Sequence, residues 1–495
     1  MFEMKTPEQA GVSSEDVMRF VNTLNQMGLA THGVLLMRGT SVFGEFYWKP
    51  FHRDYCHRMY SQTKSFVGVA VGLLLADGRL TLDDPVAAYF PDKAERELPE
   101  NLRRLTIRNL LTMETCGRTG SWFECDDPDR VHWYMNDNSA HLPGGMRFEY
   151  DSPGSQVLCT LVERLSGLSF FDFLNQRLFS KMGAFQTASV LKTRNDDSFG
   201  DSAMLCTLRD IAAFARLLMN GGRWEGRQLI DEAYVRAATA PQVDNDEMGF
   251  DSWETRGYGY QIWCLRNQGF FFNGMGAQMT FCFPEKDLIF AVMSDNQGYP
   301  GAKSIIETAF QCCILDRMED APLQENPEAY ARCLALGEGL ELARLAGPPH
   351  SAFAAELEGK SYACPENPTG ITRFFFHFPS RDEGELHYTN AQGDKTLRFG
   401  LGKNVFDFFP QLGYSNDHAG LRTTDGFRYR CAASAASAAW REPRKLLIKV
   451  QIIDRYFGNM LAMFSFAGDT AVVRMHKSAE DFLQEYQGEF VARRL

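Results

Sequence analysis

The spacing of apolar residues changes along the chain and predicts a mixed fold. Residues 7–27 carry apolar side chains at helical intervals, and residues 33–48 read as two short strands around a tight turn. Helical spacing then dominates to residue 219, and strands return over residues 258–293. Because strands stand at both ends of this region, we expect an α+β fold with one antiparallel sheet, shared by the early hairpin and the late strands, and helices packed on it.

The last third of the chain has a different pattern. Residues 328–345 are rich in Ala, Leu and Glu and predict a helix, and short strands separated by turns follow from residue 372. The Ala- and Ser-rich stretch 431–439 is expected to be a loop. Residues 479–486 are expected to form a final helix.

A chain of 495 residues is too long for one ordinary domain. The change of pattern divides it into a first domain over residues 1–318, a helical linker over residues 319–350 and a small antiparallel β domain over residues 351–495. The residues of the C-terminal domain leave open whether it covers a cleft, forms dimers or only adds stability.

The Ser-Gln-Thr-Lys stretch at residues 61–64 carries the strongest chemical signal. It lies between a predicted strand, residues 55–60, and the apolar run 66–76, which predicts a helix buried on all sides. In that helix Lys64 stands one turn after Ser61, on the same face. Burial and the positive end of a helix both destabilise an ammonium group, so a lysine placed there can act as the base that activates a serine.

A Ser-x-x-Lys pattern is common, and the chain holds a second copy at Ser189 and Lys192. That copy runs directly into the polar stretch 193–197, which is typical of a loop and would leave its lysine in water. The first copy therefore has the surroundings that activation of a nucleophile requires, and the second does not.

Two further motifs follow along the chain. Residues 143–152 read Pro-Gly-Gly-Met-Arg-Phe-Glu-Tyr-Asp-Ser, lead into another apolar stretch and place Tyr150 89 residues after Ser61. Residues 272–278 read Phe-Asn-Gly-Met-Gly-Ala-Gln and lead into the late strands. Small residues at such a place allow a substrate to lie against the strand backbone.

These three motifs, in this order and spacing, resemble those of the serine β-lactamase-like hydrolases, in the branch that holds class C β-lactamases, D-peptidases, family VIII esterases and aminohexanoate-oligomer hydrolases. The similarity covers residues 6–315. It implies a β-lactamase-like domain in which Ser61 is the nucleophile, Lys64 is the base and Tyr150 relays a proton between the nucleophile and the leaving group.

The resemblance also assigns substrate-binding roles near the third motif. The backbone N–H of Met275, to within one residue, would be the second oxyanion donor beside the N–H of Ser61. Gly274 and Asn273 precede it and would line the same edge of the site.

Two positions depart from the family pattern. Ser152 stands at a substrate-binding position where asparagine is common, and its hydroxyl can still donate and accept a hydrogen bond but is shorter than an amide side chain. Phe272 stands where the family carries Lys or His. The missing cation removes an anchor for a substrate carboxylate and counts against penicillins as preferred substrates.

Residues 115–141 predict a long loop, and long loops in compact domains are often functional. Trp122 and Tyr134 lie within this stretch and are candidates for lining the substrate pocket. Packing that shields the interior from solvent is an equal alternative for both side chains.

Composition narrows the partners and the location. A net charge of −12 argues against nucleic acid and anionic membranes as partners, and the longest apolar run is far shorter than the ~20 residues of a membrane helix. The 12 cysteines show no zinc-ligand spacing, and the N-terminus lacks the pattern of a secretory signal, so we expect reduced thiols in the cytoplasm. No nucleotide-binding glycine motif occurs, and we expect neither a cofactor nor a metal.

The expected function is that of a cofactor-independent serine hydrolase that cleaves an amide, peptide or ester bond of a small molecule or peptide through an acyl-enzyme. The sequence does not name the substrate, and it leaves a homo-oligomer open. Two other functions also stay open: acyl transfer to an amine or alcohol, and non-catalytic binding or scaffolding on the same fold.

Overall fold

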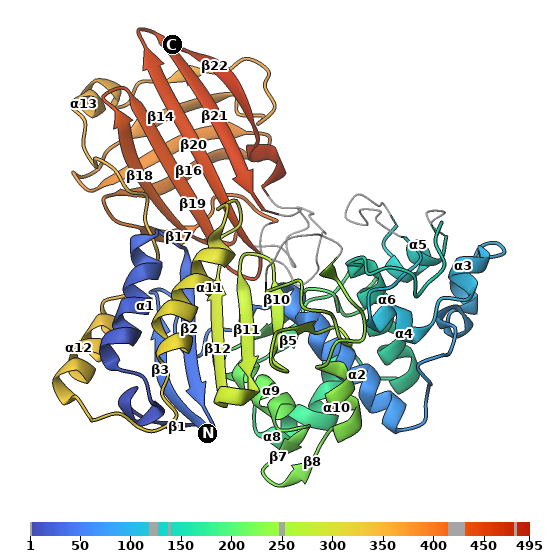
Figure 1. Ribbon diagram of the computed structural model, residues 1–495. Helices are drawn as coiled ribbons and strands as arrows, with labels where there is room; N and C mark the ends of the chain where they lie inside the picture. The colour runs from blue at the N-terminus through green and yellow to red at the C-terminus, as the bar shows by residue number, and fades with distance from the viewer. Residues whose placement is uncertain (1, 118–126, 137–139, 247–252, 414–430, 480–482) are drawn as a thin grey trace. The chain divides into compact units, whose positions relative to one another are not determined.

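The computed structural model describes residues 2–117, 127–136, 140–246, 253–413, 431–479 and 483–495 (Figure 1). The chain forms two compact units. The first holds the residues up to Ser294 together with Gly301–Glu341, and the second holds Asp295–Pro300 and Leu342–Leu495. The three candidate catalytic side chains all belong to the first unit.

A seven-stranded sheet forms the centre of the first unit. Its strand order is β1-β3-β2-β12-β11-β10-β9, and all neighbours are antiparallel except β1 and β3. The strands are β1 (Glu3–Met4), β2 (Thr31–Arg38), β3 (Ser41–Tyr47), β9 (Trp263–Cys264), β10 (Phe270–Gly274), β11 (Gln278–Phe283) and β12 (Leu288–Ser294). Pairing of β2 with β12 joins the early hairpin to the late strands, which confirms the expected shared sheet.

Helices cover this sheet on both sides (Figure 1). One apolar cluster contains residues of α1 (Ser14–Gln26), α11 (Ala302–Cys313) and α12 (Pro327–Glu338), and the other contains residues of α2 (Thr63–Ala76), α6 (Ser152–Ser166) and α9 (Leu208–Met219). The shorter helices of this unit are α3 (Glu100–Arg103), α4 (Ile107–Leu111), α5 (Arg130–Asn136), α7 (Phe170–Leu174), α8 (Ser180–Met182) and α10 (Glu232–Ala238). Short strands outside the sheet are β4 (His57–Arg58), β5 (Ser189–Val190), β6 (Met204–Cys206), β7 (Arg223–Trp224) and β8 (Arg227–Gln228). None of the helices in the described parts of the chain combines the length and the hydropathy that crossing a membrane requires.

The continuous apolar runs of the late strands follow from this double cover. Along β12, Ile289 and Ala291 belong to the cluster of α2 and α9, whereas Phe290 and Val292 belong to the cluster of α1 and α11. Side chains alternate between the two faces of a strand, so a strand that is apolar at every position must be buried on both faces. Helices therefore pack on both sides of the sheet.

Helix α12 is an integral part of the first unit. Its Cys333 is buried in the cluster of α1, and Arg332 pairs with Glu15 on α1. The sequence analysis placed these residues in a helical linker over residues 319–350, with a helix over residues 328–345. Gly339 in fact ends the helix as its C-terminal cap, and the first unit continues to Glu341.

Helix α2, which carries the Ser-x-x-Lys motif at its start, passes through the interior. Every residue from Thr63 to Leu74 is buried. Two glycines let its neighbours approach: a methyl group at Gly68 would lie 2.5 Å from the backbone oxygen of Tyr260, and one at Gly72 would lie 2.2 Å from the ring of Tyr234. The Tyr234 hydroxyl donates a hydrogen bond of 2.5 Å to the backbone oxygen of Gly68, which fixes the helix from that side.

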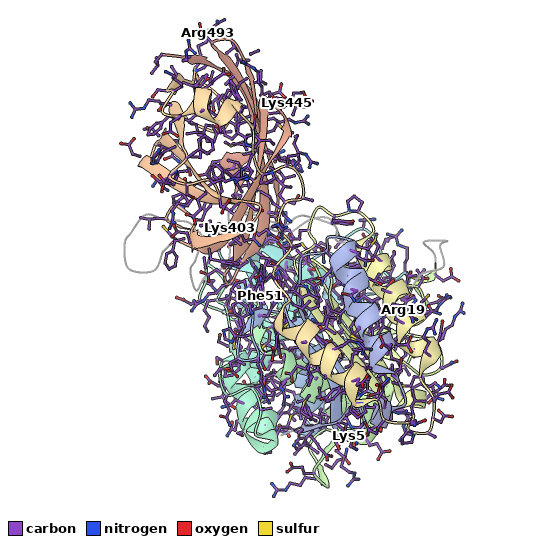
Figure 2. The ribbon with its side chains drawn as sticks, turned by 90° about the vertical axis from the view of Figure 1, so that its left-hand side faces the viewer. Lys5, Arg19, Phe51, Lys403, Lys445 and Arg493 are labelled. Carbon is purple, nitrogen blue, oxygen red and sulfur yellow. The ribbon has the colours of Figure 1, made fainter. Side chains whose placement is uncertain are left out.

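The second unit is built on a ten-stranded sheet in the order β16-β15-β14-β13-β22-β21-β20-β19-β18-β17. Its strands are β13 (Tyr362–Ala363), β14 (Arg373–His377), β15 (Glu383–Asn390), β16 (Gly393–Leu401), β17 (Val405–Phe408), β18 (Ala433–Glu442), β19 (Lys445–Ile453), β20 (Phe457–Ala467), β21 (Thr470–Ser478) and β22 (Gly488–Arg494), with the short helix α13 (Phe353–Leu357). A further pairing of β16 with β18 closes the sheet on itself. The expected C-terminal β domain is confirmed, and Figure 2 marks Lys403, Lys445 and Arg493 on it.

The Ala- and Ser-rich stretch 431–439 is not the expected loop. Most of it belongs to strand β18, which lies between β17 and β19. Small side chains are needed there because another part of the chain crosses the strand. The backbone N–H of Leu345 donates to Ser437 Oγ at 2.9 Å, and a methyl group at Gly347 would lie 2.9 Å from the Ala439 methyl.

The final helix expected over residues 479–486 is also wrong for the described residues. A single turn of 3-10 helix, Gln484–Tyr486, precedes strand β22, which pairs with β13 and β21. Tyr486 is buried, and its hydroxyl bonds to the Tyr388 hydroxyl at 2.8 Å. The aromatic residue packs beneath the sheet and does not mark a helical repeat.

Replacing Gly72 by alanine tests the fit of α2. Alanine is the better helix former, but the added methyl group would clash with the Tyr234 ring. We expect Gly72→Ala to lower the free energy of unfolding by about 1–3 kcal/mol, measured by urea denaturation. Gly339→Ala is the matched control, because its nearest neighbour atom would lie 3.6 Å away. A Gly72→Ala protein as stable as the control would contradict this packing.

Candidate active site

Ser61 and Lys64 lie in direct contact at the start of α2. Ser61 belongs to a turn of 3-10 helix, Tyr60–Gln62, that runs directly into the helix. Lys64 is 1% exposed, and its ammonium nitrogen lies 3.0 Å from Ser61 Oγ and 2.8 Å from the backbone oxygen of Asp201. The structure therefore places a serine hydroxyl beside a buried amine, and a backbone carbonyl accepts a hydrogen bond from the same amine.

The backbone immediately before the serine is strained. Tyr60 adopts φ 48°, in the left-handed region that a residue with a side chain avoids. The ring is buried, and the Arg58 guanidinium carbon lies 4.4 Å from its centroid. This packing holds the sharp turn that precedes Ser61.

Strand β10 approaches the same turn closely, and Gly274 makes this approach possible. A methyl group at Gly274 would lie 2.5 Å from the backbone oxygen of Met59 and 3.3 Å from the backbone nitrogen of Ser61. The end of β10 is thus adjacent to the Ser61 N–H. Met275 is the first residue after the strand. Its backbone N–H is the expected second donor of an oxyanion site beside the Ser61 N–H.

The turn after β10 is fixed by hydrogen bonds to its carbonyl groups. Gln278 donates to the backbone oxygens of Met275, at 3.1 Å, and of Ser294. Ser294 Oγ donates to the backbone oxygens of Gly276, at 2.6 Å, and of Ala277, at 2.9 Å. With the carbonyls held on one side, the backbone N–H groups of the turn keep a fixed direction.

Asn273 faces away from the serine. Phe272 belongs to the cluster of α2 and Phe271 to the cluster of α1, so alternation directs Asn273 to the α1 side of the sheet. There its side chain donates to Glu254, which forms an ion pair of 2.7 Å with Lys303. The structure brings Gly274 next to Ser61, with Met275 directly after it in the chain, but engages the Asn273 side chain elsewhere.

Tyr150 stands at the mouth of the site and is held by aromatic stacking. Lys64 Nζ lies 5.1 Å from the centroid of its ring. The ring stacks on Trp263 of β9 with centroids 5.6 Å apart and planes at 20°, and Phe148 packs against the same Trp263 at 5.9 Å. Tyr150 is 38% exposed, so a substrate can reach it.

Three further predicted residues belong to the described part of the chain. Ser152 is the first residue of α6, directly after the cap Asp151, and Phe272 is fully buried. Tyr134 is buried, and its hydroxyl donates to Asp151 at 3.1 Å, which is a packing role. Trp122 lies outside the described residues. The position where the family carries Lys or His therefore holds a buried phenylalanine ring and no cation.

The second Ser-x-x-Lys copy has a different geometry. Ser189 is exposed and lies on strand β5, which pairs with β6. Lys192 lies beyond the end of β5, in an isolated bridge with Ser198, so this copy lacks the helix start that brings Ser61 and Lys64 together.

The buried histidines close to the motif are satisfied by hydrogen bonds. His57 Nδ1 lies 2.8 Å from the backbone oxygen of Arg58, and its Nε2 lies 2.8 Å from His32 Nδ1. Burial lowers the pKa of His57 to about 3, so the ring is neutral, donates to Arg58 and accepts from His32. Within the described residues no group of three or more His, Cys, Asp and Glu side chains could hold a metal ion.

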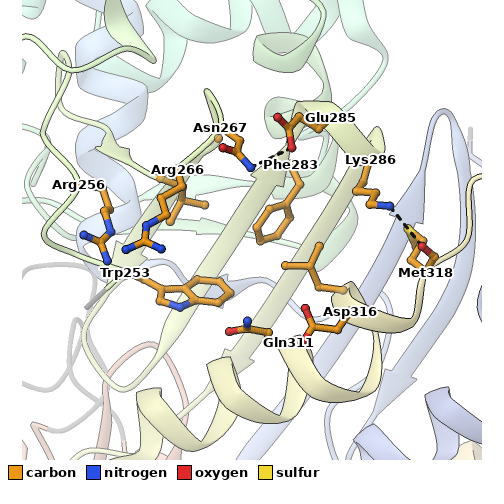
Figure 3. Close-up of a pocket in the computed structure, with 13 residues that line it drawn as sticks. Trp253, Arg256, Arg266, Asn267, Phe283, Glu285, Lys286, Gln311, Asp316 and Met318 are labelled. Carbon is orange, nitrogen blue, oxygen red and sulfur yellow. Dashed lines mark hydrogen bonds between the residues drawn. The ribbon is translucent and has the colours of Figure 1, made fainter. Parts of the chain in front are cut away.

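A cavity of about 660 Å³ lies on the opposite side of the sheet (Figure 3). Its apolar wall includes Trp253, Phe283 and Leu315, which pack against the cluster of α1 and α11. Ser61, Lys64 and Tyr150 do not line it, so this cavity is not the catalytic site.

Two contributors to the site carry no catalytic signature in the sequence. Trp263 supports Tyr150, and Gln278 fixes the turn that holds Met275. Both lie within stretches that the motif comparison covers, but only the pairing of β9, β10 and β11 shows what they contact. An aromatic residue and a buried amide near a motif have many structural uses, so sequence alone does not select them.

Comparison with known proteins agrees with this geometry. The family model described as Beta-lactamase matches residues 20–309, which is more than half of the chain. The chain belongs to the beta-lactamase family. The expected class, a β-lactamase-like serine hydrolase, is thereby confirmed at the level of the family.

Three similar proteins show how far the likeness extends. The 6-aminohexanoate-dimer hydrolase of Paenarthrobacter ureafaciens is 28% identical over 284 residues, which cover 53% of this chain and 72% of that protein. An octameric penicillin-binding protein homologue from Pyrococcus abyssi matches 96% of this chain and 99% of its own, with TM-score 0.51 and 15% identity. EstCE1, a hydrolase with promiscuous acyltransferase activity, matches 60% of this chain and 98% of its own, with TM-score 0.50 and 14% identity. At such identities the two structures show a shared fold.

The close approach of β10 predicts a strong effect of Gly274→Ala. The methyl group would push the strand away from the Ser61 turn and widen the gap in which the sequence analysis expects the oxyanion site. We expect the rate of Ser61 acylation to fall about 100-fold or more while the fold persists, measured by labelling kinetics and circular dichroism. Gly339→Ala, with no such contact, should label like the wild type. Equal labelling of both variants would contradict the placement of the oxyanion site.

The Glu307 carboxyl on α11 is expected to make the free energy of unfolding depend on pH. Burial, and then the nearby Glu254, raise the pKa of Glu307 to about 7 from 4.5. The folded state therefore holds a proton that the unfolded chain releases, so this carboxyl lowers stability as pH rises from about 4.5 to about 7. Glu307→Gln should remove about 1–3 kcal/mol of that fall, measured as urea stability at pH 5 and pH 8. An unchanged pH dependence would rule out this assignment.

Proposed function

We propose that the protein hydrolyses amide or ester bonds through an acyl-enzyme on Ser61. The observation that carries the proposal is the contact of 3.0 Å between Lys64 Nζ and Ser61 Oγ inside the protein, next to the close approach of β10. A nucleophile, a base and a pair of adjacent backbone N–H groups are the parts that acyl transfer needs.

Acylation begins when Ser61 Oγ attacks the substrate carbonyl carbon. Lys64 takes the hydroxyl proton, assisted by Tyr150, while the backbone N–H groups of Ser61 and Met275 stabilise the oxygen that becomes negative. The bond to the leaving group then breaks, and Tyr150 returns the proton to the departing amine or alkoxide. The product of this half-reaction is an ester on Ser61.

Deacylation repeats these steps with water. The Lys64 and Tyr150 pair takes a proton from the attacking water, the oxyanion site stabilises the second tetrahedral intermediate, and Ser61 leaves with a proton returned to its oxygen. The exposed position of Tyr150 supports this role, because the relay must reach both the leaving group and the incoming water.

The absence of a cation at the Phe272 position bears on the substrate class. Phe272 fills the strand position of the family's cation with buried apolar core, so a substrate carboxylate finds no cation there. This favours neutral amides and esters over penicillins. The Paenarthrobacter ureafaciens relative is named 6-aminohexanoate-dimer hydrolase, and two amino acids joined through an amine and a carboxyl group form an amide, which supports an amide substrate.

Acyl transfer is the alternative outcome of the same acyl-enzyme. The printed name of EstCE1 couples hydrolysis with acyltransferase activity on a similar fold. An amine or alcohol would then replace water in the second half-reaction. Product analysis with added nucleophiles separates the two, because transfer gives a new amide or ester and hydrolysis gives the free acid.

Assembly is a separate question, and the sequence analysis left a homo-oligomer open. The structure from Pyrococcus abyssi is named as octameric, and it matches residues of both units of this chain. We propose a homo-oligomer on this basis. Light scattering of the purified chain would give the mass directly, and a monomer mass would overturn this part of the proposal.

Intact-protein mass spectrometry tests the proposed nucleophile. After incubation with a fluorophosphonate, the wild type should gain one adduct per chain and Ser61→Ala should gain none. Lys64→Met should react at least about 100-fold more slowly, because the base is lost. A penicillin used in parallel should react more slowly than an activated ester.

The second Ser-x-x-Lys copy supplies a matched control. Ser189→Ala changes an exposed serine of the same sequence pattern, so its adduct should equal that of the wild type. An adduct that persists in Ser61→Ala would refute the assignment of the nucleophile. No adduct in the wild type would favour the non-catalytic alternative.

A further inference from the structure

Residues 200–202 lie against Lys64, and contacts on both sides of Asp201 fix its backbone carbonyl. Gly200 leaves no room for a side chain, because a methyl group there would lie 2.2 Å from Cys159 Cβ on α6. The Gly200 N–H donates a hydrogen bond of 2.9 Å to the Gln156 side-chain oxygen. On the other side of Asp201, the Arg58 guanidinium donates to the backbone oxygen of Ser202 at 2.9 Å. These contacts fix the carbonyl of Asp201, which accepts from Lys64 at 2.8 Å.

The side chain of Asp201 is buried beside the same lysine. It is 1% exposed, and among the described residues neither carboxylate oxygen has a partner of ordinary hydrogen-bond geometry. A carboxylate in such a place lowers stability, and a neutral side chain of the same size would avoid that loss. This cost points to a role in the chemistry of the site and not in the fold.

The surroundings of Asp201 are positively charged. Burial raises the pKa of the Asp201 carboxyl. Lys64 on α2, Arg130 at the start of α5, the Ser202 hydroxyl and Arg58 on β4 oppose this rise in part, because each favours the ionised carboxylate. The Arg130 and Arg58 guanidinium carbons lie 4.1 Å and 5.7 Å from the Phe199 ring centroid, just before this segment. The Cys159 thiol on α6 is a further neighbour, and burial keeps it protonated by raising its pKa.

We propose that the Asp201 carboxylate is a positioning residue for Lys64, the third member of a Ser61, Lys64 and Asp201 arrangement. When Ser61 Oγ attacks, its proton moves to Lys64 Nζ, and the nearby carboxylate stabilises the ammonium that forms. Asp201 itself takes no proton, and its backbone carbonyl fixes the direction of Lys64. This extends the proposed function, because a base in nucleophilic catalysis is oriented and supported by a further group.

The proposal gives a signature that a purely structural role would not produce. Asp201→Asn keeps the size and the backbone carbonyl but removes the negative charge. The ammonium form of the base then loses support, so the acidic limb of the pH profile for fluorophosphonate labelling should move to lower pH by about 1 unit. The plateau rate at high pH should fall by about 10- to 100-fold, because the transition state loses the same support.

Matched variants separate this effect from damage to the fold. Asp197→Asn changes an acid on the same segment whose side chain meets Asn195 at 3.0 Å, and its pH profile should match the wild type. Asp201→Ser removes the charge with a smaller side chain and should show the same shift as Asp201→Asn, and Asp201→Glu should restore the limb toward its wild-type position.

The outcomes also separate this inference from the proposed function on which it rests. If the wild type does not label, the proposed function fails. If the wild type labels and Asp201→Asn keeps both its acidic limb and its plateau, only the positioning role is overturned. Failure of Asp201→Asn and Asp201→Ser to fold would assign Asp201 a structural role and overturn it as well.

Discussion

The burial of α2 is the constraint on which the rest of the site depends. The Lys64 amine lies 3.0 Å from the Ser61 hydroxyl, and a helix enclosed by apolar neighbours keeps water away from this contact. Residues Thr63–Leu74 meet this condition, and Gly68 and Gly72 let Tyr260 and Tyr234 close around them. The positions of α6, α9, α10 and the central sheet all follow from enclosing this one helix.

The chemistry arises where three distant segments meet at the start of that helix. The strained turn at Tyr60 presents Ser61, the segment around Asp201 holds Lys64, and β10 brings Gly274 against the Ser61 backbone. Each meeting requires the absence of a side chain or the presence of a fixed carbonyl. Backbone groups in fixed positions thus complement the Ser61, Lys64 and Tyr150 side chains in the described part of the site.

Sequence patterns predict the parts of this account that act over short distances. A contact between residues three apart at a helix start follows from helical geometry, so the Ser61 and Lys64 pair could be predicted. The shared sheet could also be predicted, because strands stand at both ends of the helical region. The direction of Asn273 could not, because it depends on which residue of β10 packs against α2. The role of small residues in β18 depends on a crossing segment nearly one hundred positions away, at Leu345.

Asp201 shows the same limit most clearly. It follows Lys64 by 137 residues, and nothing in its local sequence separates it from a surface acid. Only the folded chain shows that it is buried among Lys64, Arg58 and Arg130. Short motifs thus identify the reacting groups, whereas the groups that support them become visible only through tertiary structure.

The central claim is that Ser61 alone becomes acylated. Rapid quenching after mixing with a chromogenic ester, followed by proteolysis and peptide mass mapping, tests it most directly. The account predicts a burst of product of one equivalent per chain and an acyl group on the peptide that contains Ser61. Turnover with no acylated peptide, or an acyl group on another residue, would contradict it.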